Sequence, residues 1–189
     1  MESKEITDKE TNRLILKIAD SSHAELVLDY YIRNKEFLQE WEGLKKDEFY
    51  TKEYHEKYLE EINNETSLRF WLFKKEDISK IIGTVSLNNI IRGAFQSCHL
   101  GYKLDKDEIN NGYMTEALAK IIEIGFNDLK LHRMEANIMP KNKASLRVVE
   151  KLGFYNEGLA YKYLYINGKW ENHIHMVLIN ERLKNIVHN

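Results

Sequence analysis

The segment at residues 110–117 combines residue types that can bind an anionic group through the backbone. It reads Asn-Asn-Gly-Tyr-Met-Thr-Glu-Ala and stands between an alternating apolar stretch and a long helical pattern. The first turn of a helix leaves backbone N–H groups without partners, and the helix dipole adds positive charge there. Gly112 permits a close backbone approach and a positive φ. These features predict a phosphate-binding helix N-terminus, and an ordinary strand-to-helix loop is the alternative.

Two histidines near the C-terminus could hold a metal. His173 and His175 are two residues apart, which puts both side chains on one face of a strand. No third ligand accompanies them, so no metal site is expected. Cys98 is the only cysteine, and it lies in a predicted strand. An intrachain disulfide is therefore impossible, and a buried apolar role is expected for Cys98.

Elements on both sides of residues 110–117 must hold this segment in place. A strand ending near Asp105 is predicted from the alternating residues Cys98, Leu100, Tyr102 and Leu104. Apolar residues then recur at helical spacing from Gly112 to Leu129. A second strand carries Met134, Ala136 and Ile138. Pro140 stops it, Asn142 can cap the next helix, and Gly153 suits the left-handed end of that helix. This order predicts one parallel strand pair.

In the rest of the chain, the pattern of apolar residues and turns predicts mainly antiparallel strands. The N-terminal half contains a strand at residues 14–18, helices opened by Asp20 or Ser21 and by Thr51, and a hairpin with arms 69–73 and 81–87. In the last hairpin, Asn167-Gly168 is typical of a two-residue type I′ turn. That turn predicts Tyr165 opposite Trp170 and Tyr161 opposite Ile174.

Composition limits the function classes. A chain of 189 residues suits one domain, expected at residues 11–183 between loose tails at 1–10 and 184–189. The net charge of -2 gives no whole-chain argument for nucleic-acid binding, and no nucleic-acid reading motif is found. No apolar run approaches the ~20 residues that a membrane helix needs. The polar N-terminus lacks the apolar core of a secretion signal, so a cytoplasmic protein is expected.

Two stretches, GYMTEA from Gly112 and NKASLRVVEKLGF from Asn142, resemble the acyl-CoA-binding motifs of the GNAT N-acetyltransferase superfamily. They are most similar to its RimJ/RimL branch, the N-terminal acetyltransferases of ribosomal proteins. The resemblance also covers NRLILKIAD from Asn12, IIGTVSLNNI from Ile81 and YINGKWENH from Tyr165. It implies a mixed α/β (α+β) domain whose mostly antiparallel sheet, flanked by helices, splays at a gap that holds acetyl-CoA.

The resemblance also implies which residues contact the cofactor. The pyrophosphate lies on the backbone amides of residues 110–115, and the pantetheine arm runs along residues 102–104. The expected contacts are Tyr102, Lys103, Leu104, Asn110, Asn111, Gly112, Tyr113, Met114, Thr115, Asn137, Asn142 and Ser145. The chain departs from the family pattern at Ile109, usually Arg or Gln, at Met114, usually a small residue, and at Asn110, often glycine in this branch.

The implied reaction is direct attack of a neutral amine on the acetyl thioester. Many members protonate the leaving thiolate with a tyrosine at the position of Val149, which leaves Ser145 as the candidate donor. His99, His173 and Glu171 are the candidate bases. Each can equally be an ordinary strand residue, and Ser145 can equally be a helix-start serine.

The acceptor implied by the resemblance is a protein N-terminal α-amine of the ribosomal-protein type. A small amine such as a polyamine, an amino acid or an antibiotic is the alternative, and a CoA-binding sensor without catalysis is the non-enzymatic one. Residues 37–50 are expected to border the acceptor site, although their aromatic residues can equally belong to the core. Their acidic residues could bind a basic protein tail or form an ordinary solvated face; these are Glu40, Glu42, Asp47 and Glu48. The family often dimerises, so a homodimer is expected.

Overall fold

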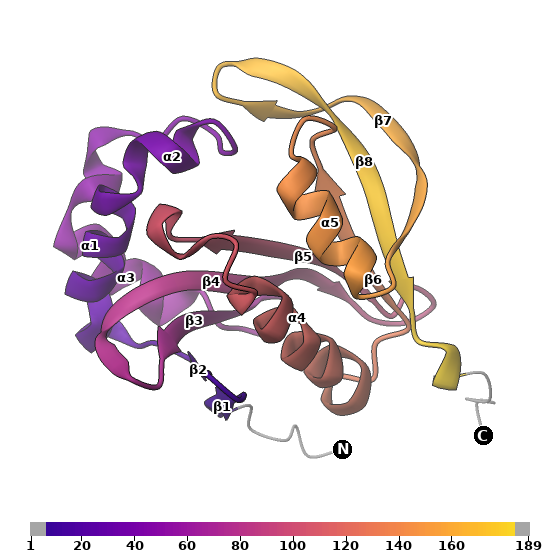
Figure 1. The fold of residues 1–189 in the computed structure, drawn as a ribbon, viewed down its shortest axis with the longest axis horizontal. Helices are drawn as coiled ribbons and strands as arrows, with labels where there is room; N and C mark the ends of the chain where they lie inside the picture. The colour runs from indigo at the N-terminus through magenta and orange to yellow at the C-terminus, as the bar shows by residue number, and fades with distance from the viewer. Residues whose placement is uncertain (1–6, 184–189) are drawn as a thin grey trace.

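An eight-stranded sheet runs through the computed structural model, which describes residues 7–183 (Figure 1). The strands lie in the order β1-β2-β3-β4-β5-β6-β8-β7. Their bounds are β1 Lys9–Glu10, β2 Leu14–Lys17, β3 Leu68–Lys74, β4 Asp77–Ile91, β5 Ser97–Leu104, β6 Arg133–Ile138, β7 Tyr155–Ile166 and β8 Lys169–Ile179. The helices are α1 Ala24–Arg33, α2 Lys35–Gln39, α3 Lys52–Glu61, α4 Tyr113–Glu123 and α5 Lys143–Lys151. Short 3₁₀ turns cover Ser21–His23, Asp47–Tyr50, Lys106–Glu108 and Glu181–Leu183, and a π-helical turn, Ile124–Asp128, extends α4.

The sheet is antiparallel except where β5 meets β6. These strands pair in parallel only over residues 97–99 of β5 and 133–135 of β6. Beyond His99, the edge of β5 that faces β6 has no strand partner among the described residues. The sheet therefore opens between β5 and β6, which confirms the predicted mixed fold with a splayed sheet.

Local signals in the sequence place most of the elements. The Thr51 hydroxyl accepts from the Tyr54 N–H, and the Asn142 side chain accepts from the Ser145 N–H at 3.1 Å. Both caps satisfy backbone donors that a helix start leaves free. Gly153 has φ +87°, as the end of α5 requires. A loose tail was expected at residues 1–10, and Lys9 and Glu10 of this segment form β1. Residues 1–6 and the second expected tail, residues 184–189, lie outside the described residues.

The last hairpin confirms one predicted strand contact and corrects the other. Tyr165 lies opposite Trp170, and Asn167 and Gly168 have φ +43° and +82°, as a type I′ turn requires. Ile174, however, pairs with Leu159, so the predicted pairing with Tyr161 is wrong. The register shifts between Ala160 and Leu164 because β7 bulges there. Within the bulge, the Lys162 N–H donates to the Asn172 side chain at 2.8 Å.

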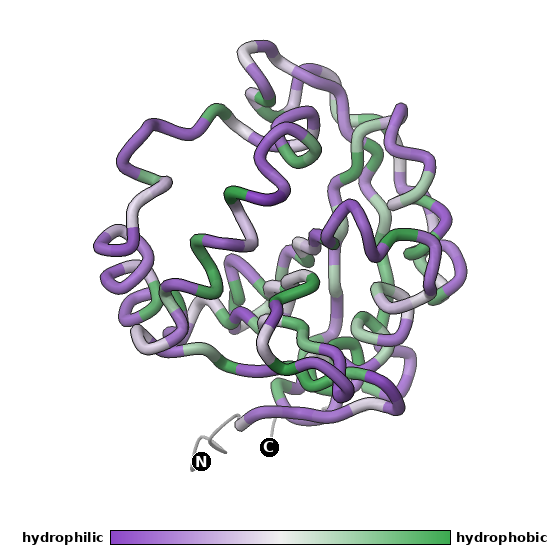
Figure 2. The backbone as a smooth tube through the Cα atoms, turned by 60° about the vertical axis from the view of Figure 1, so that its left-hand side comes forward, coloured by the Kyte–Doolittle hydropathy of each residue, from purple (hydrophilic) through white to green (hydrophobic). Residues whose placement is uncertain are grey.

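Helices cover both faces of the sheet and bury two apolar clusters. The first cluster lies under α4 and α5 and includes Phe70, Leu72 and Cys98, so the expected burial of this thiol is confirmed. The second lies under α1 and α3 and includes Trp71 and Phe73. Neighbouring β3 residues point to opposite faces because side chains alternate along a strand. Figure 2 shows hydrophobic stretches along the central strands and hydrophilic residues along the outer loops. None of the described helices is long and apolar enough to cross a membrane.

Candidate active site

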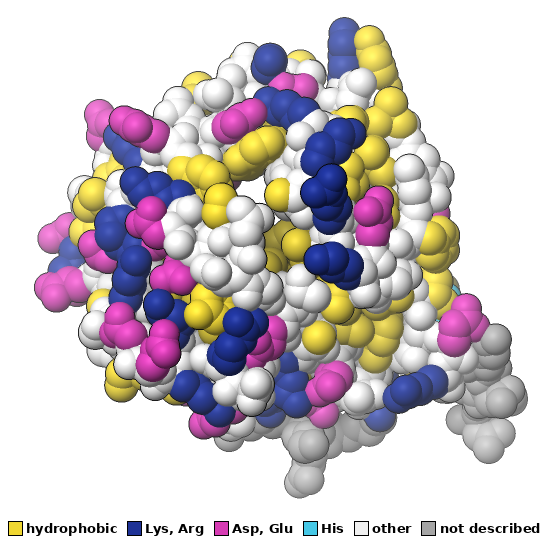
Figure 3. Space-filling model, in the orientation of Figure 1, with side chains coloured by type: hydrophobic (Ala, Val, Ile, Leu, Met, Phe, Trp, Pro, Cys, Tyr) yellow, Lys and Arg dark blue, Asp and Glu magenta, His cyan; other side chains and the backbone are white. Residues whose placement is uncertain are grey.

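A cavity of about 710 Å³ fills the opening between β5 and β6. It is visible as a hollow near the middle of the face in Figure 3, with basic side chains along one border. Ten of the residues expected to contact the cofactor line it: Tyr102, Lys103, Leu104, Asn110, Gly112, Met114, Thr115, Asn137, Asn142 and Ser145. Asn111 and Tyr113 are not part of the lining. The predicted cofactor residues therefore converge, apart from these two.

The loop before α4 has the backbone shape of an anion-binding turn. Gly112 is the N-cap of α4, with φ +78° and ψ 0°. Asn110 also has a positive φ, +63°, whereas the φ of Asn111 between them is negative. Alternation of this kind turns successive N–H groups toward one side, where an anion can bind. Asn is among the few residues that tolerate the left-handed region, so Asn110 can serve where relatives often carry glycine.

Ser145 lies in the first turn of α5 and lines the cavity. The Ser145 N–H is capped by Asn142, and its carbonyl accepts a hydrogen bond from the Tyr102 hydroxyl at 3.1 Å. The Ser145 side chain also lies within hydrogen-bonding reach of Tyr102, where it acts against the effect of burial on the pKa of the phenol. Burial raises the pKa of Tyr102, so this phenol stays protonated and donates across the cavity from β5 to α5. A polar hydroxyl at the cavity wall can donate to a group that develops negative charge.

His173 is the only one of the three candidate bases that lines the cavity in the described chain. Its side chain is buried, and its Nδ1 lies 3.1 Å from the Glu171 carbonyl oxygen. A carbonyl oxygen can only accept, so Nδ1 carries the proton and Nε2 keeps its lone pair. Burial lowers the pKa of His173 from the ordinary 6.5. The imidazole is therefore neutral at pH 7 and can accept a proton.

The other two candidate bases lie elsewhere. His99 is at the closed end of the opening, where β5 and β6 still pair, and its Nε2 is 3.8 Å from Glu135. The Glu171 carboxylate is 3.3 Å from Lys169 on the same hairpin, and neither His99 nor Glu171 lines the cavity. Glu171 still contributes through its backbone, because its carbonyl orients the His173 ring. The structure thus brings Ser145 and His173 to one cavity and leaves His99 and the Glu171 carboxylate outside it.

Residues 37–42 form one end of the cavity, as expected for the region between the first helices. Phe37, Trp41 and Glu42 line it. The Glu42 carbonyl accepts from the Asn167 N–H at 2.9 Å, which joins this segment to the tip of the β7–β8 hairpin. Later aromatic residues of the same region, Phe49 and Tyr50, pack against the second apolar cluster instead. Only the first part of residues 37–50 therefore reaches the cavity.

Of the charged residues that line the cavity, Glu42 and Lys103 were expected there, whereas Arg147 and Lys151 were not. Glu42 forms ion pairs with Lys103 and with Lys45. Arg147 and Lys151 lie one helical turn apart on α5 and line the cavity, and neither forms an ion pair with another described residue. The sequence shows that Arg147 and Lys151 are four positions apart and so share one face of a helix. Their position beside the cavity depends on how α5 packs against the sheet.

A strand edge without a partner among the described residues, a helix N-terminus and a neutral imidazole meet on one cavity, which suits an extended, phosphate-bearing ligand and proton transfer beside it. Comparison with known proteins identifies the class of protein. Residues 13–155 match the family model of the acetyltransferase (GNAT) domain. The chain belongs to the GNAT acetyltransferase family, in its RimJ/RimL-like branch, and is an N-acetyltransferase that uses acetyl-CoA as the acyl donor.

Individual relatives cover nearly the whole chain. A probable N-acetyltransferase of Bacillus subtilis, YjcK, is 41% identical over 83% of this chain and 88% of its own length. Ribosomal-protein-S5-alanine acetyltransferase from Vibrio fischeri has a crystal structure with a TM-score of 0.89 and 35% identity, covering 95% of this chain and 100% of that one. RimJ of Mycobacterium smegmatis, in complex with CoA-disulfide, has a TM-score of 0.86 at 22% identity, covering 95% and 90% of the two chains. The last similarity concerns the fold alone.

Proposed function

We propose that this enzyme acetylates the N-terminal α-amine of a protein, with a ribosomal protein as the acceptor. The observation that carries the proposal is the pairing of a neutral His173 with the Glu42 carboxylate on the lining of one cavity. Glu42, which also pairs with Lys103 and Lys45, borders the site where the acceptor enters, and His173 accepts the proton that the attacking neutral amine loses. An α-amino group has a pKa near ~8, so a weak base such as imidazole suffices. The similarity to a ribosomal-protein alanine acetyltransferase supports the same acceptor.

Different residues of the chain bind different parts of acetyl-CoA. The amides of residues 110–115 receive the diphosphate, and the open edge of β5 beyond His99 receives the pantetheine arm like an added strand. In the reaction, the amine nitrogen bonds to the acetyl carbon and the carbon–sulfur bond breaks. His173 Nε2 takes the proton from the nitrogen. The Ser145 hydroxyl donates a hydrogen bond to the departing thiolate.

The cations of α5 are expected to strengthen acetyl-CoA binding. Arg147→Glu and Lys151→Glu should each raise KM for acetyl-CoA by about 5- to 10-fold, because a favourable charge near the phosphates becomes repulsive. The effect should shrink at high salt, which screens exposed charges. Lys143→Glu is the matched control, since Lys143 lies on the same helix but does not line the cavity. Equal KM values for all three variants and the native enzyme would contradict the proposed role.

Ser145 should matter for the chemical step. Ser145→Ala is expected to lower kcat by about 10- to 100-fold, the usual effect of losing a hydrogen bond to a charged group. KM for acetyl-CoA should stay unchanged, because the Asn142 cap uses the Ser145 backbone. Ser145→Thr keeps a hydroxyl and should restore most of kcat. A native kcat in the alanine variant, measured by steady-state thiol release, would rule out this role.

The proposed function is tested by thiol release from acetyl-CoA against a panel of acceptors. The panel contains peptides beginning with Ala, Ser or Met, polyamines and aminoglycosides, and mass spectrometry locates the acetyl group. Acetylation at a peptide α-amine is the expected result. Turnover only on small amines would overturn the protein acceptor and keep the cofactor assignments. Tight CoA binding without turnover on any acceptor would favour a sensor.

The homodimer stays a prediction. β7 is the last strand of the sheet, and this hairpin exposes Tyr161, Tyr165 and Trp170. Apolar surface of this kind often marks an interface. Light scattering after size-exclusion chromatography is expected to give twice the chain mass, and Trp170→Glu should shift it to the monomer.

A further inference from the structure

The loop before α4 is held from outside the cavity by the N-terminal segment. Glu116, in the first turn of α4, accepts hydrogen bonds from the Thr11 hydroxyl at 2.6 Å and from the Arg13 backbone N–H at 2.7 Å. Arg13 Nε forms an ion pair with the second carboxylate oxygen of Glu116 at 2.7 Å. The guanidinium also lies 4.5 Å from the centre of the Tyr113 ring. Arg13 is thus fixed against the start of α4 by contacts with two of its residues.

The same guanidinium reaches one peptide group of the loop. Arg13 Nη1 donates to the Asn111 carbonyl oxygen at 3.0 Å. The peptide bond between Asn111 and Gly112 is planar and trans, so its C=O and N–H point in opposite directions. Gly112 lines the cavity, whereas Arg13 and Asn111 do not. Holding the carbonyl on the Arg13 side therefore turns the Gly112 N–H away from Arg13, toward the cavity.

Local sequence does not determine the orientation of this peptide group. Gly112 adopts positive and negative φ about equally well, so the peptide plane before it can rotate with little steric cost. A reversed plane would present the Asn111 carbonyl oxygen, a partial negative charge, to an anion in the cavity. The Arg13 contact removes that alternative. Arg13 is 98 positions away from Asn111 in the chain.

Arg13 also compensates the charge of Glu116. Burial by itself raises the pKa of this carboxyl, but hydrogen bonds from Thr11 and Arg13 outweigh it and keep the pKa low. Glu116 is therefore ionised at neutral pH, one turn from the proposed diphosphate site. Without Arg13, this carboxylate would repel a diphosphate.

We propose that Arg13 is a positioning residue for the cofactor: it fixes the Asn111–Gly112 peptide so that the Gly112 N–H binds the diphosphate. The inference rests on the proposed placement of the diphosphate at residues 110–115. Arg13 acts through the loop and need not touch the ligand. Lysine cannot replace it, because one ammonium group cannot hold the Glu116 carboxylate and the Asn111 carbonyl in the same fixed geometry.

Isothermal titration calorimetry with CoA and with pantetheine, which lacks the diphosphate and the adenosine 3′-phosphate, tests the inference. Arg13→Ala and Arg13→Lys should each weaken CoA binding by about 10- to 100-fold, the loss expected for hydrogen bonding to a charged group. Pantetheine binding should be unchanged in both. Lys75→Ala is the matched control: it breaks the 2.7 Å ion pair with Glu10, which fastens the same N-terminal segment away from the loop. This control should bind both ligands like the native protein.

The outcomes separate the inference from its premise. Thermal unfolding identifies any variant that fails to fold. If Arg13→Ala does not fold, the inference is tested with Arg13→Lys, which keeps the positive charge. Native CoA affinity in a folded Arg13 variant, full rescue by lysine, or an equal loss for CoA and pantetheine would overturn the role of Arg13. If the native protein binds CoA no more tightly than pantetheine, the diphosphate placement is wrong, and the inference is overturned with it.

Discussion

Replacing His173 with glutamine is expected to lower kcat/KM for acetyl transfer by about 10²- to 10⁴-fold, the range that general acid–base catalysis contributes. Glutamine can still bond the Glu171 carbonyl, but it offers no basic nitrogen to the cavity. His175→Gln is the matched control. His175 lies two positions along β8 and contacts the same Tyr163 ring, yet it does not line the cavity. Equal activity of His173→Gln and His175→Gln would exclude His173 as the base.

The pH dependence should follow from the buried position of His173. Only the neutral imidazole accepts a proton, and burial lowers its pKa below the ordinary 6.5. The acid limb of kcat at saturating substrates is therefore expected below pH 6.5, and it should vanish in His173→Gln. NMR titration of the His173 ring measures this pKa directly. A value above 6.5 would contradict the effect of burial.

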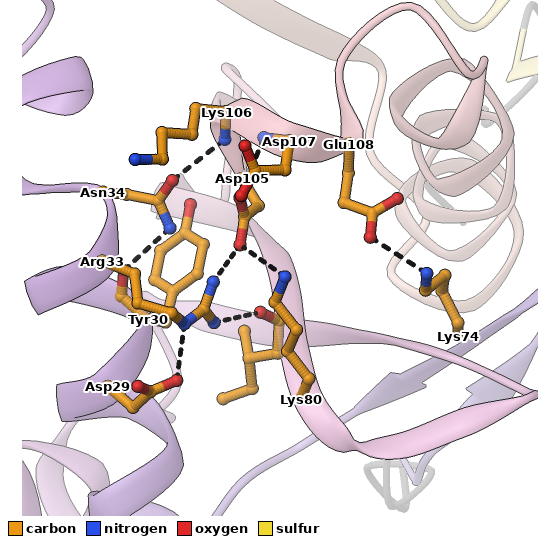
Figure 4. A network of polar contacts seen from close by, with 11 residues as sticks. Asp29, Tyr30, Arg33, Asn34, Lys74, Lys80, Asp105, Lys106, Asp107 and Glu108 are labelled. Atoms are coloured by element: carbon orange, nitrogen blue, oxygen red, sulfur yellow. Dashed lines mark hydrogen bonds and ion pairs between the residues drawn. The ribbon is translucent and has the colours of Figure 1, made fainter.

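Replacing Arg33 with methionine is expected to lower the free energy of unfolding at pH 7 by roughly 3 kcal/mol, because it leaves a buried carboxylate with fewer partners. Figure 4 shows the network: Asp105 accepts from Arg33 and from the Asp107 N–H at 3.0 Å, and Lys80 is 3.5 Å away. Asp105 is fully buried. Lys80 remains near Asp105 in the variant. The decrease in the free energy of unfolding should therefore lie at the lower end of the range measured when one partner of a buried ion pair is removed.

Urea unfolding measures this decrease in the free energy of unfolding, and two further variants test its cause. Arg33 also pairs with the exposed Asp29 at 2.6 Å, so Asp29→Asn isolates that contact and should cost at most about 1 kcal/mol. The double variant Arg33→Met/Asp105→Leu removes the buried carboxylate together with its partly exposed partner and should recover part of the stability. A double variant less stable than Arg33→Met would contradict the unpaired-charge explanation.

The stability difference between the native protein and Arg33→Met should depend on pH. Burial by itself raises the pKa of Asp105, but hydrogen bonds from Asp107 and Arg33 outweigh it and depress the pKa below 3.8. A depressed pKa in the folded state stabilises the protein above the unfolded pKa, and this contribution is lost as pH falls through the folded pKa. Without Arg33, burial dominates and Asp105 can protonate at higher pH. The difference should therefore narrow as pH falls toward 4, which unfolding curves at pH 7 and pH 4.5 measure.

The sequence by itself determined the local structure at the site. Gly112 before a helical pattern predicted the α4 N-terminus, Asn142 predicted the cap of α5, and Asn167-Gly168 predicted the hairpin turn; all three are confirmed. These features depend on residues within about four positions of each other, where helix and turn hydrogen bonds form. The family resemblance, and not local spacing, gave the residues expected at the cofactor, and most of them line one cavity.

Only the tertiary structure decided which distant residues meet. His99 and His173 both lie on predicted strands, and only the point where β5 and β6 separate puts one at the cavity and the other at the closed end. A bulge in β7 moved Tyr161 away from Ile174, because Lys162 bonds a side chain instead of the strand ladder. Arg13 reaches Asn111, and Arg33 reaches Asp105. Contacts of this kind form when the chain closes on itself, and no local spacing encodes them.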